Sequence, residues 1–402
     1  MTTTPGPPAE PCEPTIAAAA RAAEPPPLFT RNLLLLCTAA FFQMFSFQML
    51  LPVMPLYLLD IGGSEGQVGL ILGVTAGTAL LFRPLTGWVA DRYGRKPLLL
   101  AGNIDFALSM ALYPFARAVA PLLGVRSLQG AGLSAVSTAG STMVADLAPP
   151  QRRAEAMGVY GVAVNTSSAI GPLLGATIAI EAGFNAVFVV AGSVAVIGLV
   201  LTSRLPEPPH PAAPEGGARF TLISRDALFP ASIALCLFPP IGVVLSYVAV
   251  FADAEGLGNP GLFFLPYSLT LIVVRVLAGR LADRYGRIPV LLPAIMAFVA
   301  ALLVIASANH VLVLLLGALL LGVGFGISHP TILAMAVDRA PTGRQGASMS
   351  TLIGAFDIGI GGGSALAGLF VAFAGLRGVF VFAAVAPLIG ALLIAAALRR
   401  GR

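Results

Sequence analysis

The sequence predicts an all-α membrane protein whose twelve transmembrane helices form two six-helix bundles. Three observations predict this fold. Of the 402 residues, 57% are hydrophobic and only 10% are charged, which is too little charge to cover a water-facing surface. Apolar runs longer than the roughly 20 residues that cross a bilayer recur along the chain. Finally, a charged octapeptide occurs twice, as ADRYGRKP at residues 90–97 and as ADRYGRIP at residues 282–289.

The chain begins with a segment, residues 1–30, that is rich in proline, alanine and glutamate. We expect a disordered cytoplasmic tail here, because a signal peptide would need a basic start and an apolar core. The apolar runs that follow do not alternate between apolar and polar residues, which excludes a membrane β-barrel. Turn signals divide the first bundle, residues 31–203, into six predicted helices. These helices are 32–59, 67–89, 97–116, 121–145, 155–180 and 186–203.

A polar linker rich in proline and glycine, residues 204–226, separates the first bundle from a second one at residues 227–398. The second bundle contains the predicted helices 227–251, 262–280, 289–308, 311–337, 347–374 and 379–398, and residues 399–402 form a short cytoplasmic tail. Most of the 23 lysine and arginine residues fall on the side of the two termini, whereas Arg117 and Arg377 fall on the other side. The positive-inside rule therefore predicts a multi-pass protein of the cytoplasmic (inner) membrane, with both termini in the cytoplasm.

The duplicated octapeptide belongs to a longer repeat. A shift of 192 positions aligns the two octapeptides, and it also aligns Arg83 with Arg275 and Asp146 with Asp338. Matches of charged residues at one constant shift are not expected by chance. Because six helices are an even number, both copies have the same orientation, and an axis along the membrane normal relates them.

Two parallel six-helix units joined by a polar linker resemble the major facilitator superfamily. The octapeptide also resembles the signature of this family between the second and third helices, G-x-x-x-D-R-x-G-R-[KR]. The resemblance implies a transporter with a central site between two rocking bundles, in which the signature closes the cytoplasmic side and Asp91 meets the start of the eleventh helix near Gly346. The alternative is that the basic residues only orient the protein. The implied gate residues are Gly87, Asp91, Arg92, Gly94, Arg95, Gly279, Asp283, Arg284, Gly286 and Arg287.

The fifth predicted helix contains Gly171, Pro172 and Gly175. They resemble the G-P-x-x-G pattern of the antiporter branch of the same family, and the second copy lacks the proline. The resemblance therefore implies export. An ordinary proline kink is the alternative explanation of the pattern.

Three charged residues inside predicted helices are candidates for proton coupling: Asp357, Asp105 and Arg126. A carboxylate near the middle of a membrane, as expected for Asp357, must be protonated or paired. Its alternative role is a structural hydrogen bond. Arg126 lies in a pattern that resembles the R-x-x-Q-G motif of the family, and it either faces the cavity or reaches the membrane surface. Asp105 is a candidate partner of Arg126.

Further polar residues within the spans are candidates for the substrate cavity: Gln43, Gln48, Gln129, Asn165, Tyr247, Tyr267 and His329. A single histidine in a helix is also often a packed polar residue, so both roles stay open for His329. The repeat counterpart of Asp357 is Asn165, which is polar but cannot titrate.

The predicted function is proton-coupled export of a small amphipathic molecule, a drug or a metabolite, by a multidrug efflux antiporter. The alternatives are a metabolite importer or facilitator, a sensor without transport, and a lipid translocator. The residues show no catalytic set, so we expect no enzyme. We also expect no cofactor, no metal and no nucleic-acid partner, because the three cysteines have no metal-ligand spacing. The expected partners are a small-molecule substrate, protons and membrane lipid, and the expected state is a monomer.

Overall fold

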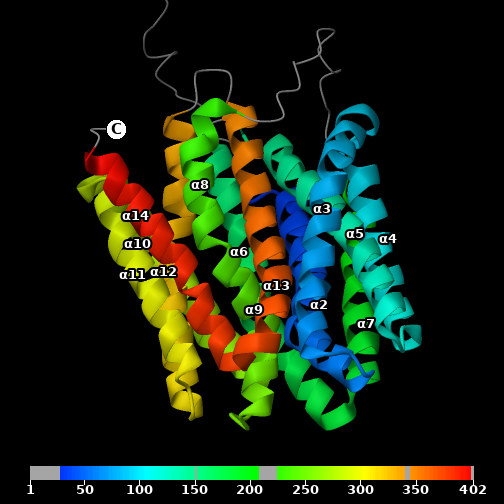
Figure 1. The fold of residues 1–402 in the computed structure, drawn as a ribbon. Coiled ribbons are helices and arrows are strands. Elements are labelled where there is room, and N and C mark those ends of the chain that lie inside the picture. The colour runs from blue at the N-terminus through cyan, green and yellow to red at the C-terminus, as the bar shows by residue number, and fades with distance from the viewer. Residues whose placement is uncertain (1–27, 150–151, 208–223, 340–344, 400–402) are drawn as a thin grey trace, which may run out of the picture.

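The structure is a computed structural model that describes residues 28–149, 152–207, 224–339 and 345–399. These residues form helices joined by short turns, and no strand occurs among them. The first half contains α2 (Arg31–Asp60), α3 (Glu65–Tyr93), α4 (Arg95–Leu112), α5 (Val119–Leu147), α6 (Arg153–Ala182) and α7 (Phe184–Ser203). The second half contains α8 (Leu228–Leu237), α9 (Pro239–Ala254), α10 (Phe264–Tyr285), α11 (Arg287–Ala306), α12 (Val311–Asp338), α13 (Gln345–Ala383) and α14 (Val385–Arg399) (Figure 1).

The helices agree with the predicted spans, with two differences. The seventh predicted span is broken at Pro239, where α8 ends and α9 begins, because proline cannot donate a backbone hydrogen bond. The twelfth predicted span, 379–398, is divided at Ala384, where α13 ends and α14 begins. The bend of α13 at Gly375, which has a φ of +65°, lies between the predicted spans 347–374 and 379–398. Most of the predicted tail 1–30 and of the predicted linker 204–226 lies outside the described residues.

By length and apolar composition, nine of the described helical segments are able to cross a membrane. One of them, Thr351–Ala396, contains the bend at Gly375 and therefore accounts for two passes. The helix α5 is long but rich in glycine, serine and threonine. The shorter apolar segment Pro260–Arg275 consists of the short 3-10 helix Pro260–Phe263 and the first part of α10. The arrangement is consistent with the twelve predicted passes.

The repeat found in the sequence has a structural counterpart in two turns. The glycines of the two octapeptides, Gly94 and Gly286, have φ angles of +98° and +88° and separate consecutive helices in each half. Such positive φ angles favour glycine over other residues. The octapeptide therefore ends one helix and begins the next.

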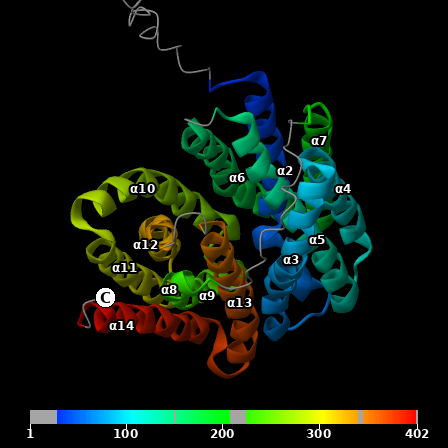
Figure 2. The ribbon, with the colours of Figure 1, turned by 90° about the horizontal axis from the view of Figure 1, so that it is seen from above.

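The helices gather into two groups, with α2 to α7 on one side and α8 to α14 on the other (Figure 2). The two halves meet where α3 packs against α13, where α6 packs against α10, and where α2 packs against α9. We call the first two contacts the α3/α13 interface and the α6/α10 interface. Both ends of the described chain lie at the same end of the bundle as the turn between α3 and α4 and the turn between α10 and α11, and we call it the termini end (Figure 1).

The two halves are in closest contact at the end opposite the termini. A Cβ atom on Gly368 of α13 would lie 2.1 Å from the carbonyl oxygen of Gly66 in α3. A Cβ atom on Gly261 would lie 2.5 Å from the carbonyl oxygen of Pro172 in α6. On α3 and α6, the glycines nearer the termini end have space around them, since a Cβ atom would meet nothing within 4 Å at Gly87, Gly158 and Gly161. The helices of both interfaces are thus tightest at the opposite end.

Candidate functional site

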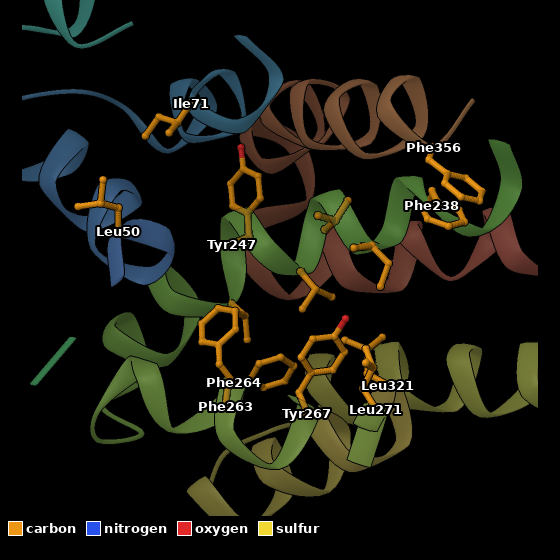
Figure 3. Close-up of a cluster of buried hydrophobic side chains, with 14 of the residues drawn as sticks. Leu50, Ile71, Phe238, Tyr247, Phe263, Phe264, Tyr267, Leu271, Leu321 and Phe356 are labelled. Carbon is orange, nitrogen blue, oxygen red and sulfur yellow. The ribbon is translucent and has the colours of Figure 1, made fainter. Parts of the chain in front are cut away.

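The α3/α13 interface is held at its opposite end by hydrogen bonds to backbone atoms. The hydroxyl of Ser364 donates to the carbonyl oxygen of Gly69 over 2.8 Å, and it lies 2.5 Å from the hydroxyl of Ser246. The hydroxyl of Tyr247 accepts from the amide of Gly69 at 3.1 Å and donates to the carbonyl oxygen of Glu65 at 3.0 Å. Figure 3 shows the Tyr247 hydroxyl directed toward the helix that carries Ile71. Tyr247, a predicted cavity residue, is fully buried in this contact.

Nearer the termini end, an ion pair crosses the same interface. The Nε atom of Arg83 in α3 donates to Oδ2 of Asp357 in α13 over 2.6 Å. The side chains are 31% and 18% exposed, so the pair is largely removed from solvent. Sequence reasoning singled out Asp357 but did not identify Arg83 as its partner. The ion pair links the two halves through a group that can lose its charge by taking up a proton.

The α6/α10 interface has polar contacts without charge. The hydroxyl of Ser268 donates to the carbonyl oxygen of Ser168 over 3.0 Å, and the amide of Asn259 donates to the hydroxyl of Thr177 over 2.8 Å. The amide of Gln48 in α2 donates to the hydroxyl of Ser168. Gln48 therefore connects α2 to this interface.

The predicted antiporter motif packs α6 against its neighbours. A Cβ atom on Gly175 would lie 2.0 Å from the carbonyl oxygen of Met49, and one on Gly171 would lie 2.8 Å from the Cβ atom of Gln48. Pro172 lies inside α6, between these two glycines, and its carbonyl oxygen faces the turn at Gly261. The glycines allow the backbones of α2 and α6 to approach closely.

Arg275 of α10 differs from its repeat counterpart Arg83, because no carboxylate of the described residues pairs with it. Its Nη2 atom lies 3.5 Å from Nδ1 of His329 in α12, and its buried Nε atom has no hydrogen-bond partner. Asn165, the counterpart of Asp357, donates to the carbonyl oxygen of Gly161 in its own helix over 2.7 Å. The α6/α10 interface therefore has the arginine without the acid.

The ring of His329 lies in an aromatic cluster of the second half. The ring centroids of Phe238 and Phe356 are 4.0 Å apart in a stacked arrangement (Figure 3), and the His329 ring lies 5.1 Å from Phe356 and 5.4 Å from Phe325. Tyr267, two turns before Arg275 on the same helix, stacks on Phe263 and is 8% exposed. We call His329 and the phenylalanines Phe238, Phe325 and Phe356 the His329 cluster.

Arg126 of α5 is buried and bonded to neutral groups. Its Nη1 atom donates to Oε1 of Gln129 over 2.6 Å, the hydroxyl of Tyr113 donates to the same oxygen over 2.7 Å, and the Tyr113 ring centroid lies 5.5 Å from the guanidinium carbon. Among the described residues Asp105 forms no ion pair with Arg126, and its buried Oδ2 atom has no hydrogen-bond partner. Arg126 also borders a central cavity of about 20 Å³, which is lined by Phe47, Leu51, Pro55, Val68, Ile71, Leu72, Leu245 and Ser246.

Gln43 of α2 lies away from the interfaces between the halves. It is 1% exposed, and neither atom of its side-chain amide has a hydrogen-bond partner in the structure. It borders a cavity of about 10 Å³ within the first half, together with Asn103, Tyr160 and Thr202. This predicted cavity residue therefore faces the interior of one half.

The signature residues lie at the termini end. Asp91 is 71% exposed, and its charged neighbour there is Arg95, 3.8 Å away. Arg95 is more closely paired with Asp146 of α5, at 3.0 Å. Arg92 lies over the ring of Trp88, one turn earlier on α3, at 5.3 Å from the ring centroid. The contact that the resemblance implies between Asp91 and the eleventh helix is not made by the described residues in this conformation.

The second copy of the signature repeats part of this arrangement. Arg287 pairs with Asp338 of α12 at 3.2 Å, as Arg95 does with Asp146 in the first copy. The guanidinium carbon of Arg284 lies 5.4 Å from the ring centroid of Tyr285. Gly279 and Asp283 lie in α10, and the side chain of Asp283 is outside what the structure describes.

Glu207, which follows the first bundle, was not identified from the sequence. Its carboxylate oxygens accept hydrogen bonds from the backbone amides of Arg95 and Lys96 at 2.7 and 2.8 Å. These amides lie at the first turn of α4, where the helix dipole favours a negative charge. Glu207 thus ties the start of the linker to the first signature.

The described residues contain no cluster of three histidine, cysteine, aspartate or glutamate side chains that could hold a metal ion. The polar residues instead lie as single groups or pairs along the interfaces between the helices.

Comparison with known proteins identifies the family. The sequence model of the Major Facilitator Superfamily matches residues 36–274 and 259–402. An uncharacterized MFS-type transporter of Methanocaldococcus jannaschii, MJ1560, is 23% identical over 368 residues, which are 88% of this chain and 95% of that protein. The multi-drug resistance efflux pump PmrA of Streptococcus pneumoniae is 27% identical over 313 residues, which are 74% of this chain and 78% of the pump.

Solved structures share the fold. A mutant of the nucleoside transporter NupG superposes with a TM-score of 0.77 at 13% identity, over 91% of this chain and 99% of that one. The human organic anion transporter MFSD10 (TETRAN) superposes with a TM-score of 0.67 at 22% identity, over 90% of this chain and 99% of that one.

Proposed function

The chain belongs to the Major Facilitator Superfamily and is a multi-pass membrane transporter, and from this premise we propose that it exports a small amphipathic molecule in exchange for protons. One relative is named a multi-drug resistance efflux pump, which supports export over uptake. We place the protein in the cytoplasmic membrane with both termini in the cytoplasm, because most basic residues fall at the termini end.

The observation that carries this proposal is the ion pair between Arg83 and Asp357. It joins α3 to α13 across the two halves over 2.6 Å, and it is mostly hidden from solvent. Protonation of Asp357 removes one of the two charges and leaves Arg83 without its counter-ion, which is unfavourable in a membrane interior. Proton binding would therefore loosen one contact between the halves, and this is the requirement for coupling a proton to alternating access.

Arg126 and Asp105 form a second polar region, in the first half. Arg126 borders the central cavity, and no basic side chain of the described residues neutralises Asp105. A carboxylate with a buried oxygen and no cation partner, and a buried cation without an acid partner, both respond strongly to a charged ligand. We assign this pair a supporting role in proton movement.

In the proposed cycle the structure corresponds to the state that opens toward the cytoplasm. The two halves are tightest at the end opposite the termini, where Gly66 meets Gly368. Cargo enters from the termini end while Asp357 holds Arg83. The end opposite the termini then opens, and the signature with Asp91 closes the cytoplasmic side. Asp357 takes up a proton from the opposite end in that state.

The test uses cells stripped of their own pumps and loaded with lipophilic dyes, one cationic and one anionic. Efflux would be followed for the wild type and for Asp357→Asn, with and without a protonophore. The matched control is Asp253→Asn, which removes an exposed acid at the end of α9. We expect efflux of at least one dye to require both the proton gradient and Asp357, and to be retained in the control.

Three results would contradict the proposal. Efflux that persists in the presence of protonophore would indicate a facilitator. Efflux that stays coupled to the gradient in Asp357→Asn would move the proton site to Asp105 and Arg126. Dye accumulation that depends on the protein would instead indicate import.

A further inference from the structure

The structure assigns a charge to the cargo: we propose that the transported molecule is an amphipathic organic anion. Its carboxylate or sulfonate would bind Arg275, and its planar apolar part would pack against the His329 cluster. This inference rests on the proposed transport function and specifies the cargo of the same site.

The first argument comes from the internal repeat. The same shift of 192 positions relates Arg83 to Arg275 and Asp357 to Asn165. At the α3/α13 interface the arginine and the acid form an ion pair at 2.6 Å. At the α6/α10 interface the position of the acid holds an amide, and the amide bonds to its own helix. Both copies thus carry the positive charge of this pair, and only one copy carries the negative charge.

The second argument is the state of Arg275 itself. Its polar neighbour is the Nδ1 atom of His329 at 3.5 Å. An imidazole is either neutral or positively charged, so it cannot supply a negative charge. Its Nε atom is buried and has no hydrogen-bond partner in the described part of the chain. Tyr267, a further titratable side chain on this face of α10, is a phenol and is neutral at ordinary pH. A guanidinium in a membrane normally pairs with an anion, so a partner from outside the protein is expected.

The third argument concerns the shape of the surroundings. The Arg275 guanidinium adjoins the His329 cluster, in which the rings of Phe238, Phe356 and Phe325 surround the imidazole. A guanidinium has a planar fork of donors that matches a carboxylate, and aromatic rings bind a flat apolar body. A charged head joined to an aromatic or other flat body would satisfy both features.

The same charges disfavour a cationic cargo. Arg126 of the first half also lacks an acidic partner among the described residues, and it borders the central cavity. The carboxylate that crosses between the halves, Asp357, is already neutralised by Arg83. At these positions a lipophilic cation would meet Arg126, Arg275 and a neutralised acid, whereas an anion would meet a favourable charge in each half. Asp105, whose carboxylate has no cation partner, is not among the residues that line the central cavity.

The experiment uses two probes with one ring system and opposite charge, 2-naphthoate and 2-naphthylmethylammonium. Each is added at millimolar concentration to the purified full-length protein in detergent, and the shift in Tm is measured. Binding to the folded state raises Tm. We expect 2-naphthoate, and not the cation, to raise the Tm of the wild type.

The variants are Arg275→Gln, Arg275→Lys and the matched control Arg117→Gln, which removes an exposed arginine at the opposite end. Loss of a charged hydrogen-bond donor typically weakens binding by at least about tenfold, so Arg275→Gln should lose the response. Arg275→Lys keeps the charge and should retain part of it. If Arg275→Gln does not fold, the comparison of Arg275→Lys with the wild type still tests the site. The control should respond as the wild type does.

The inference is overturned if the cation stabilises the wild type as well as 2-naphthoate does, if neither probe stabilises it, or if Arg275→Gln keeps the full response. Failure of the proposed function gives a different result. In that case 2-naphthoate would bind through Arg275, but its flux in proteoliposomes would not depend on an imposed pH gradient.

Discussion

The contacts within each half and the contacts between the halves have diverged to different degrees. Within the halves, Arg95 pairs with Asp146 at 3.0 Å and Arg287 pairs with Asp338 at 3.2 Å, at positions that the repeat relates. Between the halves, Arg83 has an acidic partner and its counterpart Arg275 has none among the described residues. The two copies thus share the ion pair within each bundle, and they differ in the charged contacts between the bundles. Differences between the two copies therefore indicate where function lies.

The largest effect is expected from breaking the charged interface. Arg83→Asp or Asp357→Arg places two like charges next to each other in a largely buried position, which should destabilise the protein by about 3–5 kcal/mol. The double variant Arg83→Asp with Asp357→Arg restores opposite charges, so it should recover most of the lost stability. The measurement is the thermal unfolding of the three purified variants. An equal loss of stability in the double variant would show that the stabilisation by this pair does not depend on charge alone.

A second prediction gives the uncharged interface the acid that it lacks. Asn165→Asp places a carboxylate at the position that the repeat relates to Asp357, where it can neutralise Arg275 and compete with an anionic ligand. We expect the affinity for 2-naphthoate to fall by about tenfold, as for the loss of one charged hydrogen bond. Binding would be measured by equilibrium dialysis. Unchanged or tighter binding would contradict the equivalence of the two interfaces.

The third prediction concerns the close contact between α3 and α13. A Cβ atom on Gly69 would lie 2.0 Å from the carbonyl oxygen of Ser364, whereas one on Gly77, two turns further along α3, would meet nothing within 4 Å. Gly69→Ala should therefore destabilise this conformation by about 1–3 kcal/mol through overpacking. Gly77→Ala is the control and should be neutral or slightly stabilising, since alanine favours helix. Cysteine labelling from the opposite end would show whether Gly69→Ala also opens that end.

The smallest effect is expected outside the membrane, at the opposite end. Arg377 donates to both carboxylate oxygens of Glu255, at 3.0 and 2.6 Å, and these hydrogen bonds hold the pKa of Glu255 below its usual value. Because the pKa is lower in the folded state, the pair stabilises the fold at pH above about 4.3, and this contribution is lost as the pH falls through the lower folded value.

Glu255→Gln should therefore lower Tm by at most about 2 °C at pH 7, and the difference from the wild type should vanish in acid. Thermal unfolding from neutral to strongly acidic pH would measure it. Salt should also reduce the difference, because the pair is at the surface. A difference that grows in acid would contradict the assigned direction of the pKa shift.

The sequence predicted the helices well because their limits depend on local signals. Apolar runs, prolines and the octapeptide glycines are local features, and α2, α4 and α7 begin and end within a few residues of the expected positions. The repeat also predicted the paired turns, because each copy of the octapeptide has a glycine at the same place. Glycine adopts a positive φ readily, and Gly94 and Gly286 both do so. The bend at Gly375 falls between the predicted spans 347–374 and 379–398, at a glycine that can adopt the positive φ of the bend.

The partners of the site residues could not be predicted from the sequence, because they depend on how distant helices are rotated about their axes. Asp357 bonds to a residue 274 positions away, and Tyr247 bonds to the backbone of α3 instead of facing a cavity. Gln43 is polar and lies within a span, yet it points into its own half. A polar residue in a span identifies a candidate, and only packing decides which face it occupies.

The fluorescence of Trp88, whose ring contacts Arg92, can report on one helix end without an added label. Trp88 is the single tryptophan of the chain, and its ring is 51% exposed at the termini end of α3. All tryptophan emission of the protein therefore comes from one side chain, one turn before the first signature acid. The wavelength of indole emission shifts with the polarity of the surroundings of the ring. Selective excitation of tryptophan in the unlabelled wild-type protein would therefore follow the environment of this helix end as ligand and protons are added.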